Sequence, residues 1–278
     1  MRPSTLGIIG LGAIGGSLAR QAKQAGIPTV LGWSPDAAER AAARRDGAID
    51  DAPEPVDVAR AADLLILAAP PAANLQLLET LHTTRRDGVI TDVGSVKRAI
   101  VARAEALGLG SRFAGSHPLA GTHDHGFAAS RANLFVNAVV YITPAAGGDG
   151  AARAVAGFWE TVCAARTIVV DAAAHDAEIA LTSHLPQIVA SLLGRYLAEQ
   201  APNGATFGPG AKDTTRLAAS EPTLWTEILL LNRDMVLPAL RSLEEPLAEL
   251  ERALEQGDAS AVTAWLATAA QWRRSIGA

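Results

Sequence analysis

TLGIIGLGAIG, residues 5–15, is the stretch of sequence that decides the fold. Residues 5–9 read as a short buried strand, because they are apolar apart from Thr5 and Gly7 and are followed by Gly10. The apolar pattern over residues 14–25 predicts a helix directly after them. A strand that passes through a glycine turn into a helix is the first half of a βαβ unit.

The glycines between this strand and helix follow the spacing G-x-G-x-x-G. Gly10 permits the tight turn, Gly12 lets a pyrophosphate approach the backbone, and Gly15 lets helix and strand pack closely. The helix N-terminus adds free N–H groups and a positive dipole. In this context the motif predicts a dinucleotide site. The predicted cofactor contacts in the loop are Gly10, Gly12, Ala13, Ile14 and Gly15.

Strands and helices alternate as far as residue 171, which predicts a parallel sheet with right-handed crossovers. After Asp171 no segment reads as a strand. The fold class is therefore α/β, with an N-terminal Rossmann-type parallel-sheet domain (1–171) followed by an all-α helical dimerisation domain (172–278). Further strands are predicted at 29–33, 63–69, 88–93, 113–114, 138–143 and 167–170. In the second domain we predict one helix over 175–200 with a kink at Pro186, one or two long helices over 221–255, a last helix over 259–276, and a loop over 206–212.

Composition excludes several classes of protein. The chain has 278 residues, 49% of them hydrophobic, and a net charge of -5, which argues against disorder and against a broad nucleic-acid-binding surface. Cys163 is the only cysteine, so no intrachain disulfide forms, and a cytoplasmic location is expected. No signal peptide and no apolar run of membrane-spanning length is present. The apolar helical half predicts a homodimer.

The choice of dinucleotide depends on the end of the second strand. NAD enzymes place an acidic residue there to bind the ribose 2′-hydroxyl, whereas this chain has Ser34. A serine removes repulsion toward a 2′-phosphate and can donate to it, and Arg40 or Arg44 lies nearby in sequence. Asp36 weakens this argument, so NADP is favoured and NAD stays open. Ala69 and Pro70, at the end of the next strand, are also predicted to contact the cofactor.

Polar residues in this largely apolar chain indicate the candidate catalytic residues. His117 lies in GSHPLAG, residues 115–121, where small residues and Pro118 predict a stiff turn that presents the imidazole as a general base. Ser95 follows a buried strand and reads most simply as a helix cap. We favour a site without metal, because the histidines lack the HExxH spacing and no cysteine helps. His175 and His184 are interpreted as satisfied core residues.

Five segments in this order resemble the prephenate/arogenate dehydrogenase family. They are residues 10–15, 92–97, 115–121, 175–186 (His175-Asp176 and Ser183 to Pro186) and 212–225 (Lys212 to Arg216, and Trp225). The resemblance implies oxidative decarboxylation of prephenate or arogenate with hydride transfer to NAD(P), His117 serving as base and Ser95 orienting it. It also implies that Arg216 binds a substrate carboxylate. The further substrate contacts are Asp213, Gly210, Thr122 and His184.

Two positions depart from the family pattern. His123 stands where the family often has glutamate, so an acidic gating role is in doubt there. Gln187 stands where many prephenate-using members have a second histidine. We expect this neutral amide to favour arogenate or to permit both substrates.

Three other functions fit parts of the sequence. One is a 4-amino-4-deoxyprephenate dehydrogenase. A second is a β-hydroxyacid dehydrogenase or imine reductase, although such enzymes need a lysine or aspartate where this chain has His184. The third is a non-catalytic NADP-sensing protein, which would need neither His117 nor Arg216.

Overall fold

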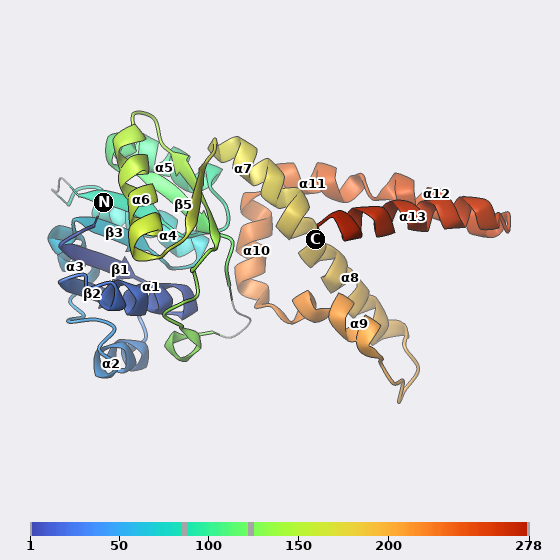
Figure 1. Cartoon of the computed structure of the whole chain (residues 1–278), viewed down its shortest axis with the longest axis horizontal. Helices are drawn as coiled ribbons and strands as arrows, with labels where there is room; N and C mark the ends of the chain where they lie inside the picture. The colour runs from blue at the N-terminus through green and yellow to red at the C-terminus, as the bar shows by residue number, and fades with distance from the viewer. Residues whose placement is uncertain (1, 85–87, 122–124, 277–278) are drawn as a thin grey trace. The chain divides into compact units, whose positions relative to one another are not determined.

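The computed structural model describes residues 2–84, 88–121 and 125–276 (Figure 1). It divides into two compact units, Met1–Asn232 and Arg233–Ala278. The helices between residues 172 and 232 therefore belong to the first unit. The domain boundary placed at Asp171 from the sequence stays a prediction.

A four-stranded parallel sheet begins the first unit, in the order β2-β1-β3-β4. A single parallel bridge between Ile90 and Phe113 leads from it to a second sheet in the order β5-β6-β7. The strands are β1 (Thr5–Ile9), β2 (Thr29–Trp33), β3 (Leu64–Leu67), β4 (Val89–Asp92), β5 (Ala114–Pro118), β6 (Val139–Pro144) and β7 (Arg166–Val169).

The prediction that all strands pair in parallel is wrong for β5 and β6, which are antiparallel. Parallel neighbours need a crossover, which is usually a helix. The described part of the connection, residues 119–121 and 125–138, contains only a 3₁₀ turn at Phe127–Ala129. Without a crossover helix the chain returns beside β5 in the opposite direction.

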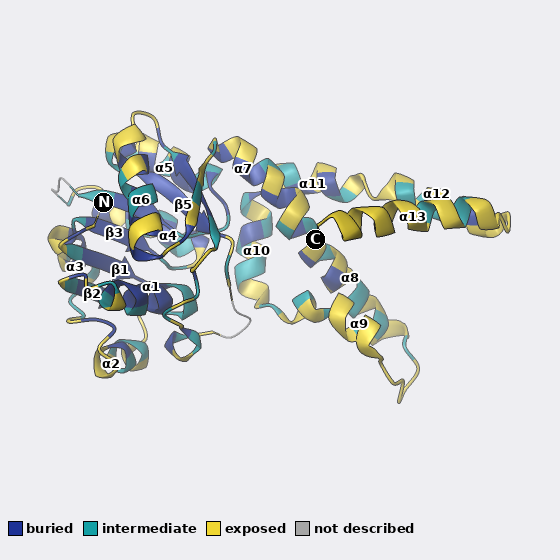
Figure 2. Ribbon diagram, viewed as in Figure 1, coloured by how far each residue is buried: buried dark blue, intermediate teal, exposed yellow. Residues whose placement is uncertain are grey.

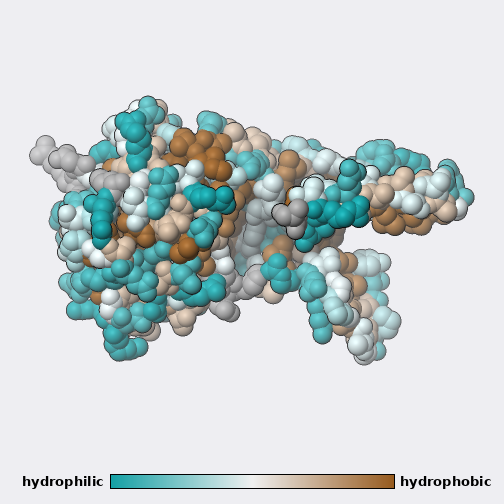
Figure 3. Space-filling view, in the orientation of Figure 1, coloured by the Kyte–Doolittle hydropathy of each residue, from teal (hydrophilic) through white to brown (hydrophobic). Residues whose placement is uncertain are grey.

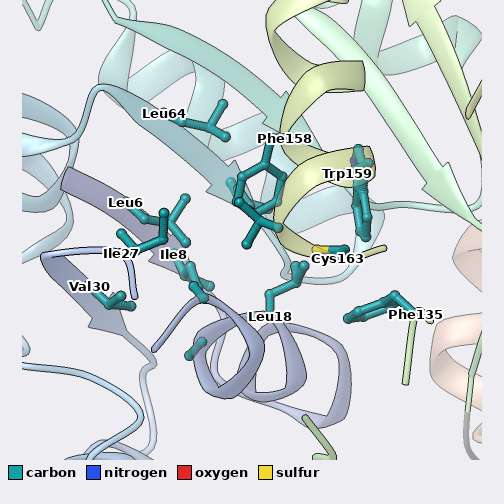
Figure 4. Packing of buried hydrophobic residues seen from close by; sticks show 14 of the residues in the cluster. Leu6, Ile8, Leu18, Ile27, Val30, Leu64, Phe135, Phe158, Trp159 and Cys163 are labelled. Carbon is teal, nitrogen blue, oxygen red and sulfur yellow. The ribbon is translucent and has the colours of Figure 1, made fainter. Parts of the chain in front are cut away.

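Helices cover both faces of the first sheet. On one face α1 (Ala13–Gln24) and α6 (Asp149–Val162) bury Leu18, Phe158 and Trp159 in one cluster with Leu6 and Ile8 of β1 (Figure 4). A second cluster joins the opposite face to the helices that cover it. Those helices are α3 (Pro55–Ala61), α4 (Pro71–Leu81) and α5 (Arg98–Ala106). Helix α2 (Ala37–Arg45) follows β2, and the backbone N–H of its second residue, Ala38, donates to the Asp36 carboxylate at 2.7 Å.

The rest of the first unit is helical, as predicted. The single helix predicted over 175–200 is divided into α7 (Ala172–Ile179), a π-helical turn (Ala180–His184) and α8 (Leu185–Gln200), so the irregularity lies just before Pro186. The loop predicted over 206–212 is wrong from Pro209 onward, because proline at the first position starts α9 (Pro209–Thr214). A 3₁₀ turn (Arg216–Ala219) and α10 (Pro222–Leu231) follow.

The second unit consists of α11 (Arg233–Arg241), α12 (Glu244–Glu255) and α13 (Ala259–Ser275). Asp258 caps α13, and the indole of Trp265 donates to the Pro246 carbonyl at 3.0 Å, which ties α13 to α12. α13 has no buried residue and is drawn largely in the exposed colour (Figure 2). Within the described residues, no helix has both the length and the apolar character needed to cross a membrane.

Candidate active site

A cleft of about 650 Å³ opens where the parallel strands end. The carboxyl ends of β1, β3 and β4 meet at one edge of the sheet, which is where ligands bind in open α/β sheets. The glycine loop, residues 68–71 after β3, residues 93–95 after β4 and residues 117–121 at the end of β5 all line it. The predicted contacts Ala69 and Pro70 therefore lie in the cleft.

Two of the three loop glycines are required by the protein's own packing. Gly10 has φ of +104°, and a Cβ there would lie 2.5 Å from the carbonyl oxygen of Ala68. A Cβ on Gly15 would lie 1.8 Å from the carbonyl oxygen of Gly10. These glycines shape the turn and bring helix α1 close to it.

Gly12 differs, because a Cβ at this position would meet nothing within 4 Å. It lines the cleft together with Ala13 and Ile14, and it precedes α1 without a side-chain cap on the first turn. The chain leaves open space and uncapped N–H groups at one helix N-terminus, as a bound pyrophosphate requires. The residues present thus fit a dinucleotide cofactor.

His117 also lines this cleft, but on a strand rather than on the predicted turn. It is the fourth residue of β5 and pairs with Tyr141 of β6. Pro118 is tolerated at the strand end, where the ladder stops. The side chain is buried with 9% exposure, so the sheet, not a stiff turn, holds the imidazole at the cleft.

Ser95, the other predicted catalytic residue, lines the cleft with His117. The simpler interpretation of Ser95 as a helix cap is wrong, because α5 begins at Arg98 after Lys97. The backbone N–H groups of Lys97 and Arg98 donate instead to the two carboxylate oxygens of Asp176, at 2.7 and 3.0 Å. The hydroxyl of Ser95 is thus not consumed by helix capping.

His175 and Asp176 form a line of side chains behind His117. Nδ1 of His117 lies 2.9 Å from Nε2 of His175, and Nδ1 of His175 lies 2.8 Å from Oδ1 of Asp176. His175 is fully buried and bonded, as expected for a core histidine, yet its partner is the predicted base. No role was predicted for Asp176 from the sequence. Its position next to His175 in the family match was the available signal.

Burial lowers the pKa of His117 well below its ordinary 6.5, and nearby His175, Lys97 and His184 lower it further. His117 is therefore neutral at pH 7 and able to accept a proton. For Asp176, burial raises the pKa, but the hydrogen bonds from His175, Arg98 and Lys97 outweigh it and the net pKa is lowered. Asp176 is therefore a carboxylate.

A buried ion pair supports the strand that carries His117. Lys97 and Asp92 are exposed by no more than 1%, and the Lys97 ammonium donates to the Asp92 carboxylate. The same Nζ donates to the carbonyl oxygen of Ser116 at 2.8 Å. The pair thus links the end of β4 to β5 one residue before His117.

Helix α10 and the π-helical turn supply lining residues that the sequence analysis did not assign to the site. Leu224, Trp225 and Ile228 of α10 line the cleft, as do Ser183 and His125. The Ala72 N–H donates to the Glu227 carboxylate at 3.0 Å, which ties α4 to α10. Trp225 was noted only as part of the family match. Its regular placement in an apolar helix gave no further signal.

The remaining predicted substrate residues that the structure describes are not among those that line this cleft. The Gln187 amide donates to the Leu217 carbonyl at 2.8 Å, so it holds α8 to the turn after α9. His184 is buried and faces the Asn232 amide at 3.2 Å, with its ring edge toward Trp225. Arg216, Asp213 and Gly210 are exposed. Their substrate roles, like that of Gln187, stay predictions. Thr122 and His123 lie outside the described residues.

Ser34 has an acidic partner that its position in the sequence did not indicate. It is 2% exposed, and its hydroxyl donates to the Glu39 carboxylate of α2. The other Glu39 oxygen lies 3.4 Å from where a Cβ of Gly126 would sit, and Gly126 lines the cleft. Arg40 donates to the carbonyl oxygens of Ser34 and Pro35, and Arg44 pairs with Asp51. A carboxylate therefore stands at the end of β2.

A glycine loop with an uncapped helix N-terminus and a neutral imidazole share one cleft at the end of a parallel sheet, and this defines a nicotinamide-dependent dehydrogenase. The family model "Prephenate dehydrogenase, nucleotide-binding domain" matches residues 18–169, and "Prephenate dehydrogenase, dimerization domain" matches residues 171–268. The chain belongs to the prephenate dehydrogenase family.

Known relatives agree with this assignment. Prephenate dehydrogenase of Lactococcus lactis is 34% identical over 92% of this chain and 72% of its own length. Cyclohexadienyl dehydrogenase of Zymomonas mobilis is also 34% identical, over 91% of this chain and 89% of its own. The crystal structure of prephenate dehydrogenase from A. aeolicus, in complex with hydroxyphenyl propionate and NAD+, superposes with a TM-score of 0.91 at 28% identity, covering 98% of both chains.

Proposed function

We propose that this protein oxidatively decarboxylates prephenate, arogenate or both, with hydride transfer to NAD(P), to give 4-hydroxyphenylpyruvate or tyrosine. The observation that carries the proposal is the shared cleft, in which His117 and Ser95 face the same space as Gly12. The base and the cofactor loop thus lie where one substrate reaches both.

The proposed chemistry follows from the state of His117. A nicotinamide held at the glycine loop would supply the acceptor for the hydride that leaves C4 of the cyclohexadiene ring. His117, neutral and buried, accepts the proton of the C4 hydroxyl as that hydride leaves. Loss of the C1 carboxylate as CO₂ returns its bonding electrons to the ring, which becomes aromatic, and His117 returns the proton to the phenolate oxygen. Ser95 orients the hydroxyl or His117.

A kinetic matrix tests the proposal, with prephenate and arogenate each paired with NAD+ and NADP+ and the absorbance of reduced nicotinamide as readout. Turnover of prephenate or arogenate supports it. Failure of both substrates, in a protein that still binds the dinucleotide, would favour the cofactor-sensing alternative. Turnover only of a β-hydroxy acid or of 4-amino-4-deoxyprephenate would favour the other dehydrogenases.

For the cofactor we infer NAD, whereas Ser34 taken alone predicted NADP. The Glu39 carboxylate stands beside Ser34, where the adenosine ribose binds in this fold class. A carboxylate accepts a hydrogen bond from a ribose hydroxyl and repels a 2′-phosphate. Arg40 and Arg44, the cations considered for that phosphate, are bonded to backbone carbonyls and to Asp51.

Replacing Glu39 by Gln is expected to shift the ratio of the NADP+ and NAD+ dissociation constants by about tenfold or more toward NADP+, because a charge-assisted hydrogen bond is lost and a repulsion removed. Tryptophan fluorescence titration with each dinucleotide measures both constants. Asp57→Asn, which removes an equal charge from α3, serves as the control. Equal ratios in the Glu39→Gln variant and the wild type would assign Glu39 a purely structural role.

We propose that the protein acts as a cytoplasmic homodimer through its C-terminal helices. Support comes from the dimerization-domain match over residues 171–268 and from apolar side chains that reach the surface, visible along the α12–α13 hairpin in Figure 3. The exposed residues include Leu192, Tyr196, Leu247, Leu254, Leu266 and Trp272. Sedimentation equilibrium tests this, and a monomer at micromolar concentration would contradict it.

A further inference from the structure

His117, His175 and Asp176 stand in an unbroken hydrogen-bonded line that ends at the cleft. Each link connects defined atoms, Nδ1 of His117 to Nε2 of His175 at 2.9 Å and Nδ1 of His175 to Oδ1 of Asp176 at 2.8 Å. The line runs from a β5 residue to two α7 residues. Because Nδ1 of His117 is bonded within this line, Nε2 is the ring nitrogen that stays available to a molecule in the cleft.

The carboxylate at the far end fixes the direction of the line. Asp176 accepts the N–H groups of Lys97 and Arg98, so it is held as an acceptor. An ionised carboxylate has no proton to donate, and therefore Nδ1 of His175 must carry the hydrogen of their contact. Asp176 is 1% exposed, so no bulk water competes for the bonds that its carboxylate accepts.

The proton positions of both imidazoles follow. A neutral imidazole has one donor and one acceptor nitrogen, so when His175 is neutral, hydrogen on its Nδ1 leaves Nε2 as the acceptor. The contact with His117 then requires the hydrogen on Nδ1 of His117. The lone pair of His117 is consequently on Nε2.

We propose that His175 and Asp176 are positioning residues that hold His117 in the tautomer with its lone pair on Nε2, ready to accept the substrate hydroxyl proton. The catalytic role of this tautomer rests on the proposed function, whereas the hydrogen bonds that fix the tautomer do not. Free imidazole exchanges between its tautomers, and the wrong one presents an N–H to the hydroxyl. The line removes that competing state.

The surroundings of His175 keep its ring in place. It is fully buried, and the ring of Tyr141 meets it edge-on at a centroid distance of 5.4 Å. The Asn232 amide donates to the backbone carbonyl of Asp176 at 2.8 Å, which anchors the next residue. A flip of either imidazole would put a carbon where a nitrogen is bonded.

The direct test is the tautomer of His117 in the full-length protein with NAD+ bound. Two-bond ¹H–¹⁵N correlation spectra of protein labelled at histidine report which ring nitrogen carries hydrogen, and His117→Asn identifies the His117 signals. Hydrogen on Nδ1 of His117 supports the inference, and hydrogen on Nε2 overturns it. The spectrum needs no turnover, so this test of the tautomer stays valid even if prephenate and arogenate prove not to be substrates.

Two variants of His175 separate positioning from packing. Phe fills the space without hydrogen bonds, whereas Gln keeps one acceptor for His117 and one donor for Asp176. We expect kcat to fall about a hundredfold in His175→Phe, with substrate KM changed by no more than about twofold, and to recover at least about tenfold of that loss in His175→Gln. Equal kcat in the two variants would overturn the inference.

Discussion

Replacing His117 by Asn is expected to lower kcat by about 10²- to 10⁴-fold, the usual contribution of a positioned general base. Asparagine keeps a polar group of moderate size in β5 but has no basic nitrogen. The dissociation constant of the dinucleotide is expected to stay near the wild-type value, because the glycine loop lies elsewhere in the cleft. Steady-state kinetics and fluorescence titration measure the two effects.

The control for this variant is His82→Asn, which removes an exposed histidine after α4. Normal turnover in His117→Asn would eliminate the base assignment. The pH profile adds a second check in the wild type. Because the pKa of His117 lies below 6.5 and the neutral form is active, kcat/KM should hold steady as the pH falls through 6.5 and decline only below it.

Replacing Lys97 by Met is expected to lower the free energy of unfolding by about 3–5 kcal/mol, because it leaves the Asp92 carboxylate buried without its partner. This is a large share of the roughly 5–15 kcal/mol that stabilises a typical domain. Urea denaturation followed by circular dichroism measures the change. Adding Asp92→Leu to the same protein should recover part of the loss, since no unpaired charge then remains.

The matched control makes the same substitution at Lys23, whose partly exposed pair with Asp50 has an N–O distance of 2.8 Å. That variant is expected to lose about 1 kcal/mol or less, because solvent screens the pair. A Lys97→Met protein as stable as Lys23→Met would mean that the Asp92–Lys97 pair does not support the site.

Features encoded in short stretches of sequence were predictable. The glycine loop is one, since its spacing between a strand and a helix predicts both the backbone turn and a dinucleotide ligand. The location of His117 at the cleft is another, although its presentation on a turn was wrong and its role as base stays a prediction. Proline after histidine suggested a turn, whereas pairing of β5 with β6, 20 residues further on, decides the strand.

Features that depend on distant contacts were not predictable. His117 and His175 are 58 residues apart, so nothing near either one reveals the line to Asp176. Ser34 and Glu39 are close in sequence, but their contact depends on how α2 leaves the end of β2. The bond from the Gln187 amide to the Leu217 carbonyl was also not predictable, because only the turn after α9 brings that partner to it.

The proposed hydride transfer from substrate C4 to the nicotinamide is tested most directly with prephenate or arogenate carrying deuterium at C4, incubated with the wild-type protein and NAD+. The account predicts that the deuterium appears on C4 of the reduced nicotinamide, with one CO₂ released for each label transferred. Product that keeps its deuterium, or cofactor that stays oxidised with both substrates, would contradict it.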